Sequence, residues 1–468
     1  MKFSNIFYSL IVSFIVAVCV VHIVGCAQIG NPTGGPKDTL PPKLVAADPD
    51  MNTTNFTGNK ITMDFDEYIN VKDIQTNLLV SPYPKKNPTI TFKGKTVTIK
   101  LKDTLKANTT YAINFGNGLV DVHEGNIYKN LTYVFSTGST IDSLKISGSV
   151  VVAETGKVDS TILVLLYPAD APDSAVQKSK PQYVTRLMMP SGKFVFTHLP
   201  AKSFRIYALE DKGGSKTYNS PTEEFAFIDS TLQASTSTNN PVTLFAYAEQ
   251  KAKPAPATTT STGKSSKASK KFKYTTSLNG AQDILSGLEI DFNAPLKEFD
   301  ESKIILTDTF YKKVPFRILT DSTGQKVTLK RTWKPEENYK LIIVKDGFSD
   351  TLGNFLNKTD TISFKTKKES DYGTLILRFP NIDLSKHPVI QFVQNNVVVE
   401  SASLKSTEWH ADLFNPGEYS LRILYDTNDN GVWDPGNYLK KIQPEKVISF
   451  DQTLKIKADW DNEREIKL

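Results

Sequence analysis

The stretch of this sequence with the most suggestive chemistry is residues 426–434, where oxygen-bearing side chains alternate with other residues. Oxygen ligands at positions 1, 3 and 5, a glycine at position 6 and a further oxygen at position 9 are typical of a calcium-binding loop. The loop follows the strand-like run that ends at Leu424. The candidate ligands are Asp426, Asn428, Asn430 and Asp434.

Two features argue for a plain hairpin at this place. Position 12 of the pattern is Asn437 and not the bidentate glutamate of an EF-hand, and no helices are expected on either side. The corresponding place in an earlier repeat reads Asp211-Lys212-Gly213-Gly214, which lacks the ligand pattern. We therefore keep a weak calcium site and an Asn/Asp-rich hairpin as alternatives, and no other cofactor is expected.

No residue pattern in the sequence indicates an enzyme. The sequence has no Gly-x-Ser-x-Gly, no His-Glu-x-x-His and no phosphate-binding loop. The acids Asp64, Asp66 and Glu67 do not by themselves specify hydrolysis. Two tryptophans, Trp333 and Trp409, either stack on sugars or fill a core. Four histidines lack metal-ligand spacing: His123, His198, His387 and His410.

The N-terminal sequence predicts a signal peptide and a membrane anchor. Met1-Lys2 is followed by an apolar run over residues 6–24 that ends in Gly25-Cys26. Such a run is typical of a signal peptide, and its length of about 19 residues also approaches a membrane span. No Lys or Arg cluster follows, which favours the signal peptide. Cys19 lies within the run, so Cys26 would be the single cysteine of the processed chain, without a disulfide or a catalytic thiol.

Ile23-Val24-Gly25-Cys26 resembles the lipobox of bacterial lipoproteins, in which the cysteine becomes the lipidated first residue. The resemblance implies lipidation at Cys26 and, because Ala27 follows, the outer membrane of a Gram-negative cell. The side of that membrane on which the protein lies stays open. The Gly/Pro-rich residues 26–43 would then form a tether.

Composition places the basic charge in one segment. The net charge is +6, but residues 251–273 hold seven lysines and no acid, so the remainder is close to neutral. We therefore expect no nucleic-acid partner. Residues 249–272 are rich in Lys, Thr, Ser and Pro and predict a flexible linker, across which the two halves of the chain would move independently.

Short alternating apolar and polar runs predict an all-β protein built of tandem β-sandwich modules. Four segments of residues 44–138 recur in order about 227–230 positions later, which indicates an internal duplication. The matched segments are 61–66 with 288–293, 95–100 with 325–330, 118–126 with 347–354, and 133–137 with 362–366. Turns such as Asp121 to Asn126 are expected to be structural, with the Asp accepting backbone N–H bonds.

The duplicated segments resemble the bacterial Ig-like domain of surface-layer proteins (the SbsA type), on the strand ending in Asp64-Phe65, the entry Asn108-Thr109-Thr110-Tyr111 and the turn at 121–126. The runs 163–167, 193–196 and 204–209, like 375–379, 389–393 and 419–424, more weakly resemble a transthyretin-like sandwich. These resemblances imply folds and no chemistry. The lipobox and these sandwiches together are similar to outer-membrane lipoproteins of Bacteroidota.

The sequence thus predicts alternating Ig-like and transthyretin-like sandwiches. The expected organisation is a signal peptide at 1–25, a tether at 26–43, a first module at 44–138, a second at 139–248, a linker at 249–272, a third module at 273–368 and a fourth at 369–468. The predicted function is that of a non-enzymatic, lipid-anchored envelope protein with a protein partner, such as an accessory subunit of an outer-membrane assembly or transport complex. The alternative is a glycan-binding surface lipoprotein.

Overall fold

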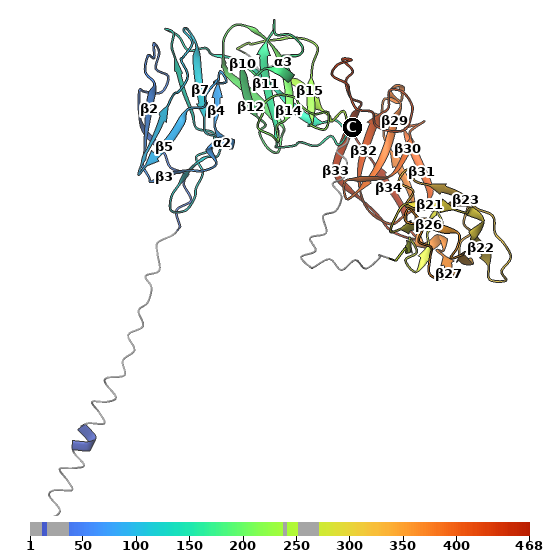
Figure 1. Ribbon diagram of the computed structural model, residues 1–468. Helices are drawn as coiled ribbons and strands as arrows, with labels where there is room; N and C mark the ends of the chain where they lie inside the picture. Colours follow the sequence, from blue (N-terminus) through green and yellow to red (C-terminus); the bar gives the residue numbers. More distant parts are fainter. Residues whose placement is uncertain (1–11, 16–36, 237–240, 251–270) are drawn as a thin grey trace, which may run out of the picture. The chain divides into compact units, whose positions relative to one another are not determined.

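The computed structural model describes residues 12–15, 37–236, 241–250 and 271–468 (Figure 1). Cys26 and most of the expected signal peptide, tether and linker lie outside these residues. Within them, no helix is long and apolar enough to cross a membrane. The chain forms two compact units, one of residues up to 79 together with 84–139, and one of residues 80–83 together with 140–468.

The prediction of an all-β protein of sandwich modules is confirmed. The short helices α2 (Ile74–Asn77) and α3 (Ala175–Lys178) and three 3₁₀ turns accompany the strands of the described residues. The 3₁₀ turns are η1 (Glu301–Lys303), η2 (Glu369–Asp371) and η3 (Leu384–Lys386).

The first module pairs its strands into three small antiparallel sheets. One has the order β1 (Leu44–Asp48), β2 (Lys60–Phe65), β6 (Thr96–Lys100), β5 (Thr89–Lys93). The second has the order β4 (Leu79–Ser81), β7 (Thr110–Asn114), β9 (Thr132–Ser136). The third pairs β3 (Ile69–Val71) with β8 (Leu119–Asp121).

The third module repeats this arrangement, so the structure supports the predicted repetition of domains. Its first sheet has the order β18 (Tyr274–Thr276), β20 (Leu288–Phe292), β24 (Lys326–Lys330), β23 (Arg317–Thr320). Its second has the order β19 (Ala281–Gln282), β27 (Asp360–Thr366), β25 (Asn338–Ile343), β22 (Ile304–Asp308). Its third pairs β21 (Leu296–Phe299) with β26 (Phe348–Asp350). The segments matched by sequence fall on β2 and β20, on β6 and β24, on β8 and β26, and on β9 and β27.

The second module is a sandwich of two sheets. One has the order β13 (Lys193–Leu199), β10 (Leu144–Val152), β17 (Val242–Ala246), with β17 parallel to β10. The other has the order β12 (Tyr183–Arg186), β11 (Ile162–Pro168), β14 (Ser203–Glu210), β15 (Phe225–Phe227), and β16 (Leu232–Gln233) also pairs with β14. Apolar side chains between 146 and 246 form its core.

The fourth module has the same strand order as the second. One sheet has the order β31 (Glu408–Phe414), β28 (Gly373–Arg378), β34 (Asp461–Glu465), with β34 parallel to β28. The other has the order β30 (Val397–Ser403), β29 (Pro388–Gln394), β32 (Gly417–Tyr425), β33 (Lys446–Ile456). A separate core gathers apolar residues between 375 and 456.

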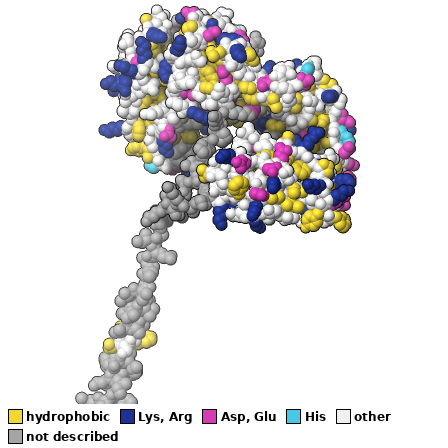
Figure 2. Space-filling view, turned by 45° about the vertical axis from the view of Figure 1, so that its right-hand side comes forward, with side chains coloured by type: hydrophobic (Ala, Val, Ile, Leu, Met, Phe, Trp, Pro, Cys, Tyr) yellow, Lys and Arg dark blue, Asp and Glu magenta, His cyan; other side chains and the backbone are white. Residues whose placement is uncertain are grey.

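Strand periodicity explains how each core is filled. In β2, Ile61 and Met63 are fully buried while Thr62 and Asp64 point away from the core, and β20 repeats the alternation with Leu288 and Ile290. Because successive side chains in a strand face opposite sides, this pattern buries one face of each sheet. Charges of both signs are interspersed over the visible surface (Figure 2).

The turn predicted at Asp121 is present, and the carboxylate of Asp121 has a structural role in it. Its carboxylate accepts backbone N–H bonds from Glu124 at 2.6 Å, Gly125 at 3.0 Å and Asn126 at 2.6 Å, and Gly125 has a φ of 78°. Asp350 accepts equivalent bonds in the third module. Burial alone would raise the pKa of Asp121, but these hydrogen bonds outweigh it and lower that pKa.

Candidate functional site in the loop between β32 and β33

The loop that carries the calcium pattern begins with a buried carboxylate. Asp426 follows β32 directly and has no exposed surface. Its carboxylate accepts the backbone N–H of Asn430 at 3.2 Å and that of Gly431 at 2.6 Å, and Gly431 has a φ of 79°. Asp426 therefore holds the turn in shape in the same way as Asp121 does, because a carboxylate satisfies several backbone donors at once.

The other predicted ligands contact one another. The side-chain amides of Asn428 and Asn430 each donate to the same oxygen of Asp434 at 2.7 Å. The amide oxygen of Asn430 accepts the backbone N–H of Val432 at 2.7 Å. The structure therefore brings together all four predicted residues, and their oxygens accept protein hydrogen bonds.

Glu445 is the central acceptor of this loop, and sequence reasoning missed it. It lies at the far end of the loop, just before β33, and is buried. Its carboxylate accepts the backbone N–H of Thr427 at 2.7 Å and that of Asp434 at 3.1 Å, and its carbonyl accepts the indole N–H of Trp433 at 2.9 Å. No spacing rule pairs Glu445 with Asp426, so only the fold reveals it.

These contacts do not assemble an open cage for a cation. Among the described residues, no group of three or more His, Cys, Asp or Glu side chains is placed to hold a metal ion. Calcium bound at this oxygen would have to displace the two amide donors that now occupy Asp434. The calcium hypothesis stays a prediction, and the observed geometry is that of a hydrogen-bonded hairpin.

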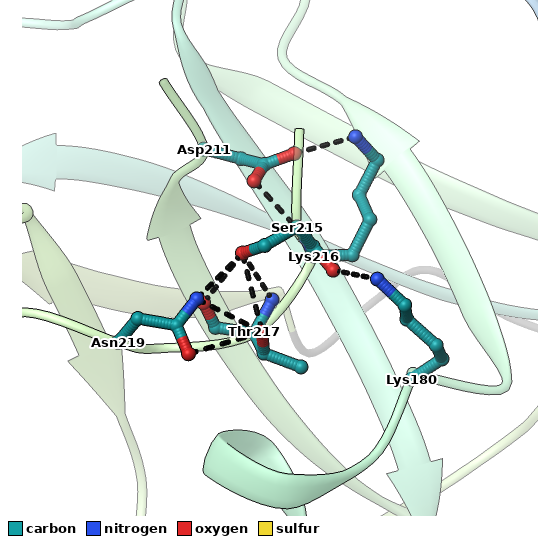
Figure 3. A network of polar contacts seen from close by, with 6 residues as sticks. All are labelled: Lys180, Asp211, Ser215, Lys216, Thr217 and Asn219. Carbon is teal, nitrogen blue, oxygen red and sulfur yellow. Dashed lines mark hydrogen bonds and ion pairs between the residues drawn. The ribbon is translucent and has the colours of Figure 1, made fainter. Parts of the chain in front are cut away.

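The second module contains a related turn, shown in Figure 3. The carboxylate of Asp211, which follows β14, accepts the backbone N–H of Lys216 at 3.0 Å and also pairs with the ammonium of that lysine. Ser215, Thr217 and Asn219 exchange further hydrogen bonds beside it. A buried aspartate after this strand is thus shared by both modules, while the calcium-like spacing belongs to the fourth module alone.

The second half of the β32–β33 loop packs against the second module. Tyr438 at the tip of the loop is only 2% exposed. Its ring centroid lies 5.1 Å from that of Phe225, 5.1 Å from that of Phe227 and 6.0 Å from that of Tyr207, in edge-on geometry. These three rings come from β14 and β15 and form an apolar seat for the tyrosine. Edge-to-face contacts of this kind add to the stabilisation from burial.

Hydrogen bonds and an ion pair surround the buried ring of Tyr438. The Tyr438 hydroxyl donates to the backbone carbonyl of Asp173 at 2.7 Å, and its backbone N–H donates to the carboxylate of Glu249 at 3.1 Å. Lys441 pairs with the Asp173 carboxylate at 3.1 Å. The side chain of Gln443 donates to the carbonyl of Phe227 at 3.1 Å. Burial, with the nearby Tyr207 hydroxyl, raises the pKa of Tyr438, so the phenol stays protonated and donates.

Two glycines allow the backbones to approach at this contact. A Cβ added to Gly436 would lie 2.6 Å from the ring of Tyr247 and 2.7 Å from the carbonyl of Ile442. A second contact joins the loop after β10 to β33, where the Ser449 hydroxyl bonds the carbonyl of Thr155. There Gly156 has a φ of 65°, and an added Cβ would lie 3.0 Å from the backbone of Ser449.

We call this contact the clasp: residues 436–443 of the fourth module seated on the aromatic face made by Tyr207, Phe225, Phe227 and Tyr247 of the second. The clasp corrects the prediction that the halves on either side of residues 249–272 move independently. That prediction considered only the composition of the connection. Composition could not reveal that a loop of the fourth module packs against the second module, or that Glu249, at the start of the connection, takes part in this contact.

The third module is held to the fourth by a smaller contact. Tyr372, which precedes β28, is 2% exposed, and its hydroxyl donates to Asp283 at 2.8 Å and accepts the backbone N–H of Ile284 at 2.9 Å. Phe272, at the end of the expected linker, packs parallel to Phe292 with 5.5 Å between the rings. The Tyr372 contact joins the fourth module to the third, whereas Phe272 belongs to the core of the third module itself.

One carboxyl group of the second module is strongly perturbed. Burial, followed by the nearby charges of Glu210, Glu154 and Asp159, raises the pKa of Glu224 to about 7. One of its carboxylate oxygens is buried and has no hydrogen-bond partner. Perturbed carboxyls often mark active sites, but here no nucleophile or metal group accompanies it. We interpret Glu224 as a group that lowers stability when it ionises.

The remaining residues singled out from the sequence have structural partners. Asp64 accepts a bond from Thr96 at 2.5 Å and Asp66 accepts the backbone N–H of Lys43 at 2.6 Å. Trp333 is 3% exposed and fills the core of the third module, and Trp409 packs on Phe392. The four histidines lie apart: His123 near Tyr68, His198 near Asp142, His387 near Asp429 and His410 near Asp412.

A hollow of about 870 Å³ lies along the third module. Its charged lining residues include Asp283, Lys367, Glu289 and Arg331. Asp283 is 3.9 Å from Lys367, and Glu289 pairs with Lys326 at 2.7 Å, so both acids are neutralised locally. The residues that line the hollow include neither histidine nor cysteine.

Comparison with protein families places a bacterial Ig-like domain at residues 38–137. The comparison with curated protein sequences gives no match. The class defined by the fold is therefore an all-β chain of repeated sandwich modules whose first module matches the bacterial Ig-like domain. The match covers residues 38–137, about a fifth of the chain, and the third module repeats the strand order of that first module.

Several solved structures are similar to this chain at low identity. The Bacillus anthracis TIE protein is 11% identical, with 93% of this chain and 76% of that one covered and a TM-score of 0.18. The N-terminal part of the bacterial S-layer protein SbsC is 16% identical, with 36% of this chain and 40% of that one covered and a TM-score of 0.17. BcpA, the major pilin subunit of Bacillus cereus, is 11% identical, with coverages of 69% and 99% and a TM-score of 0.17.

The clasp predicts that the halves stay bound after the connection between them is cut. A protease site placed at residues 258–262 would be cleaved, and the two pieces should co-elute in gel filtration. Tyr438→Ala should weaken their association by roughly 100-fold or more, because it empties the aromatic seat. Leu439→Ala is the matched control, since Leu439 is 79% exposed. Separation of the wild-type pieces at micromolar concentration would refute the clasp.

The calcium hypothesis predicts a small, ion-dependent stabilisation of the fourth module. With only two charged ligands the affinity should be about 10⁻⁴–10⁻³ M, so millimolar calcium would add about 1 kcal/mol. Thermal unfolding is compared in calcium and in chelator for the wild type and for Asp434→Asn. A midpoint that rises with calcium in the wild type alone supports the site. Equal midpoints in both conditions leave only the hairpin.

Glu224 predicts a pH-dependent loss of stability. The unfolded chain releases this proton near pH 4.5, whereas the folded chain holds it to about pH 7, so the contribution of this group falls as pH rises through that window. Glu224→Gln should therefore stabilise the protein at pH 8, by on the order of 2 kcal/mol, and much less at pH 4. Urea unfolding of the variant, the wild type and the exposed control Glu400→Gln measures this. An equal effect at both pH values would contradict the assignment.

Proposed function

We propose that this chain is a non-enzymatic structural protein of the bacterial cell envelope, anchored by a lipid at Cys26. The observation that carries the proposal is the clasp. The most elaborate polar site of the described chain holds a loop in shape and joins two modules, and it presents no reactive group. Its contacts are those of a structural protein, in which packed modules maintain a fixed spacing.

The anchor is argued from the sequence. An apolar run followed by Ile23-Val24-Gly25-Cys26 supports processing and lipidation at the cysteine, and Ala27 supports delivery to the outer membrane. Two or more acyl chains on one residue give stable anchoring, since each buried methylene contributes about 0.8 kcal/mol. The modules would then project from the membrane surface, on a side that the sequence leaves open.

In this proposal the modules present surfaces to protein partners, as an accessory subunit of an outer-membrane assembly or transport complex. Pull-down of the native protein in mild detergent, followed by mass spectrometry, tests the partner. A stoichiometric membrane protein supports the proposal. A retained polysaccharide would support the alternative of a glycan-binding lipoprotein. That alternative needs an exposed aromatic platform; Trp333 is buried in the third module and Trp409 is partly buried against the core of the fourth, while Trp460 is 61% exposed.

Lipidation makes a direct prediction for Cys26→Ser. The variant should remain unprocessed and should lose the label when cells are fed a palmitate analogue, because the described residues offer no membrane-spanning helix in its place. Cys19→Ser is the matched control, since Cys19 lies in the part expected to be removed. Labelling of Cys26→Ser as strong as that of the wild type would contradict the anchor.

A further inference from the structure

We propose that the clasp can be exchanged between molecules, so that residues 436–443 of one copy seat on the aromatic face of a second copy. The occupant of that face would then be a second copy of this same chain. The inference goes beyond the proposed function and does not depend on the lipid anchor. It is argued from how the two sides of the clasp are built.

The inserting side is shaped entirely within the fourth module. Asp426 and Glu445 fix the two ends of the loop through the backbone bonds described above. Asn437 and Ile442 exchange backbone hydrogen bonds at 2.8 and 2.9 Å, which closes the tip around Tyr438. A loop held in this way needs no help from the second module to present its tyrosine, so it can meet the same face on another molecule.

The receiving side is shaped entirely within the second module. Phe225 lies 5.8 Å from Tyr207, 4.3 Å from Tyr218 and 6.3 Å from Phe227, all in stacked geometry, so the aromatic face is supported from its own module. The module has a core separate from that of the fourth module. Each side is therefore complete in one copy, which is the condition for exchange of an element between identical chains.

The chemistry of the two sides is specific. The tyrosine fills an apolar seat, its hydroxyl and backbone N–H meet acceptors of the second module, and Lys441 meets the Asp173 carboxylate. All these contacts come from one short loop, so a second copy would reproduce them without any new surface. Leu439 and Ile442, at 79% and 51% exposed, flank the buried tyrosine and remain uncovered within one chain. A neighbouring copy could cover this apolar rim.

Concentration decides which form is populated. The composition of residues 249–272 predicts a flexible linker, and a linker of that kind holds the two sides of one chain at an effective concentration in the millimolar range. The closed form should therefore dominate in dilute solution. Exchange should become appreciable only when the protein itself approaches that concentration, as it does for chains crowded on a surface.

The test uses two variants of the full chain that each carry one introduced cysteine, Asp173→Cys and Lys441→Cys, with a mass tag on one of them. A short bismaleimide suits this pair, because the two side chains are 37–52% exposed and meet at their ends. The variants are mixed in detergent and treated at protein concentrations from roughly micromolar to millimolar. The wild type reports any reaction at Cys26, and Lys93→Cys mixed with Lys441→Cys reports random collision.

Exchange predicts a cross-linked product of one tagged and one untagged chain. The amount of this product should rise with protein concentration to at least fivefold above the collision control, and it should disappear when both copies carry Tyr438→Ala. The same substitutions placed in one chain should give an internal product in dilute solution. An internal product at every concentration, with the mixed product never above the control, overturns the proposal. Absence of the internal product as well would overturn the clasp itself.

Discussion

The insertion of Tyr438 into the second module is the interaction on which the arrangement of residues 140–468 depends. The second and fourth modules each have their own core, and the connection at residues 249–272 is poor in large apolar residues. What joins them is one buried ring with its hydroxyl and backbone N–H satisfied, together with the close approach at Gly436 and Gly156. A buried aromatic anchor surrounded by polar contacts is the usual form of an energetically dominant interface residue.

The hydrogen-bonded loop at 426–434 positions this anchor. Asp426, Asp434 and Glu445 hold a long excursion between β32 and β33 in one shape, so the tyrosine at its tip reaches the seat without a large loss of loop entropy on contact. The second module has the shorter turn at Asp211 in the same place. The two related sandwiches thus share a buried aspartate and differ in the loop that follows, where the fourth module carries the inserting tip and the second carries the seat on its strands.

Strand periodicity and turn chemistry made much of the fold predictable from the sequence. The alternation in β2 and β20 identified the buried faces, and the Asp-Gly-Asn turns after β8 and β26 behave as expected because their chemistry is local. The duplication was also visible, since matched segments fall on equivalent strands. Local patterns could not reveal Glu445 or the seat of Tyr438, because those contacts join residues 11 to 265 positions apart. For the same reason a calcium-like spacing could not be told from a hydrogen-bonded hairpin.

The most direct test of this account is the distance between the second and fourth modules in the intact chain in solution. Spin labels at Lys212→Cys and Lys455→Cys, both on exposed side chains, report it by double electron–electron resonance, with a Cys26-only chain as the background. The account predicts one narrow distance distribution in the wild-type background that broadens when Tyr438→Ala is added. A distribution that is already broad with Tyr438 present, and unchanged by its removal, would contradict the clasp as the interaction that fixes these modules.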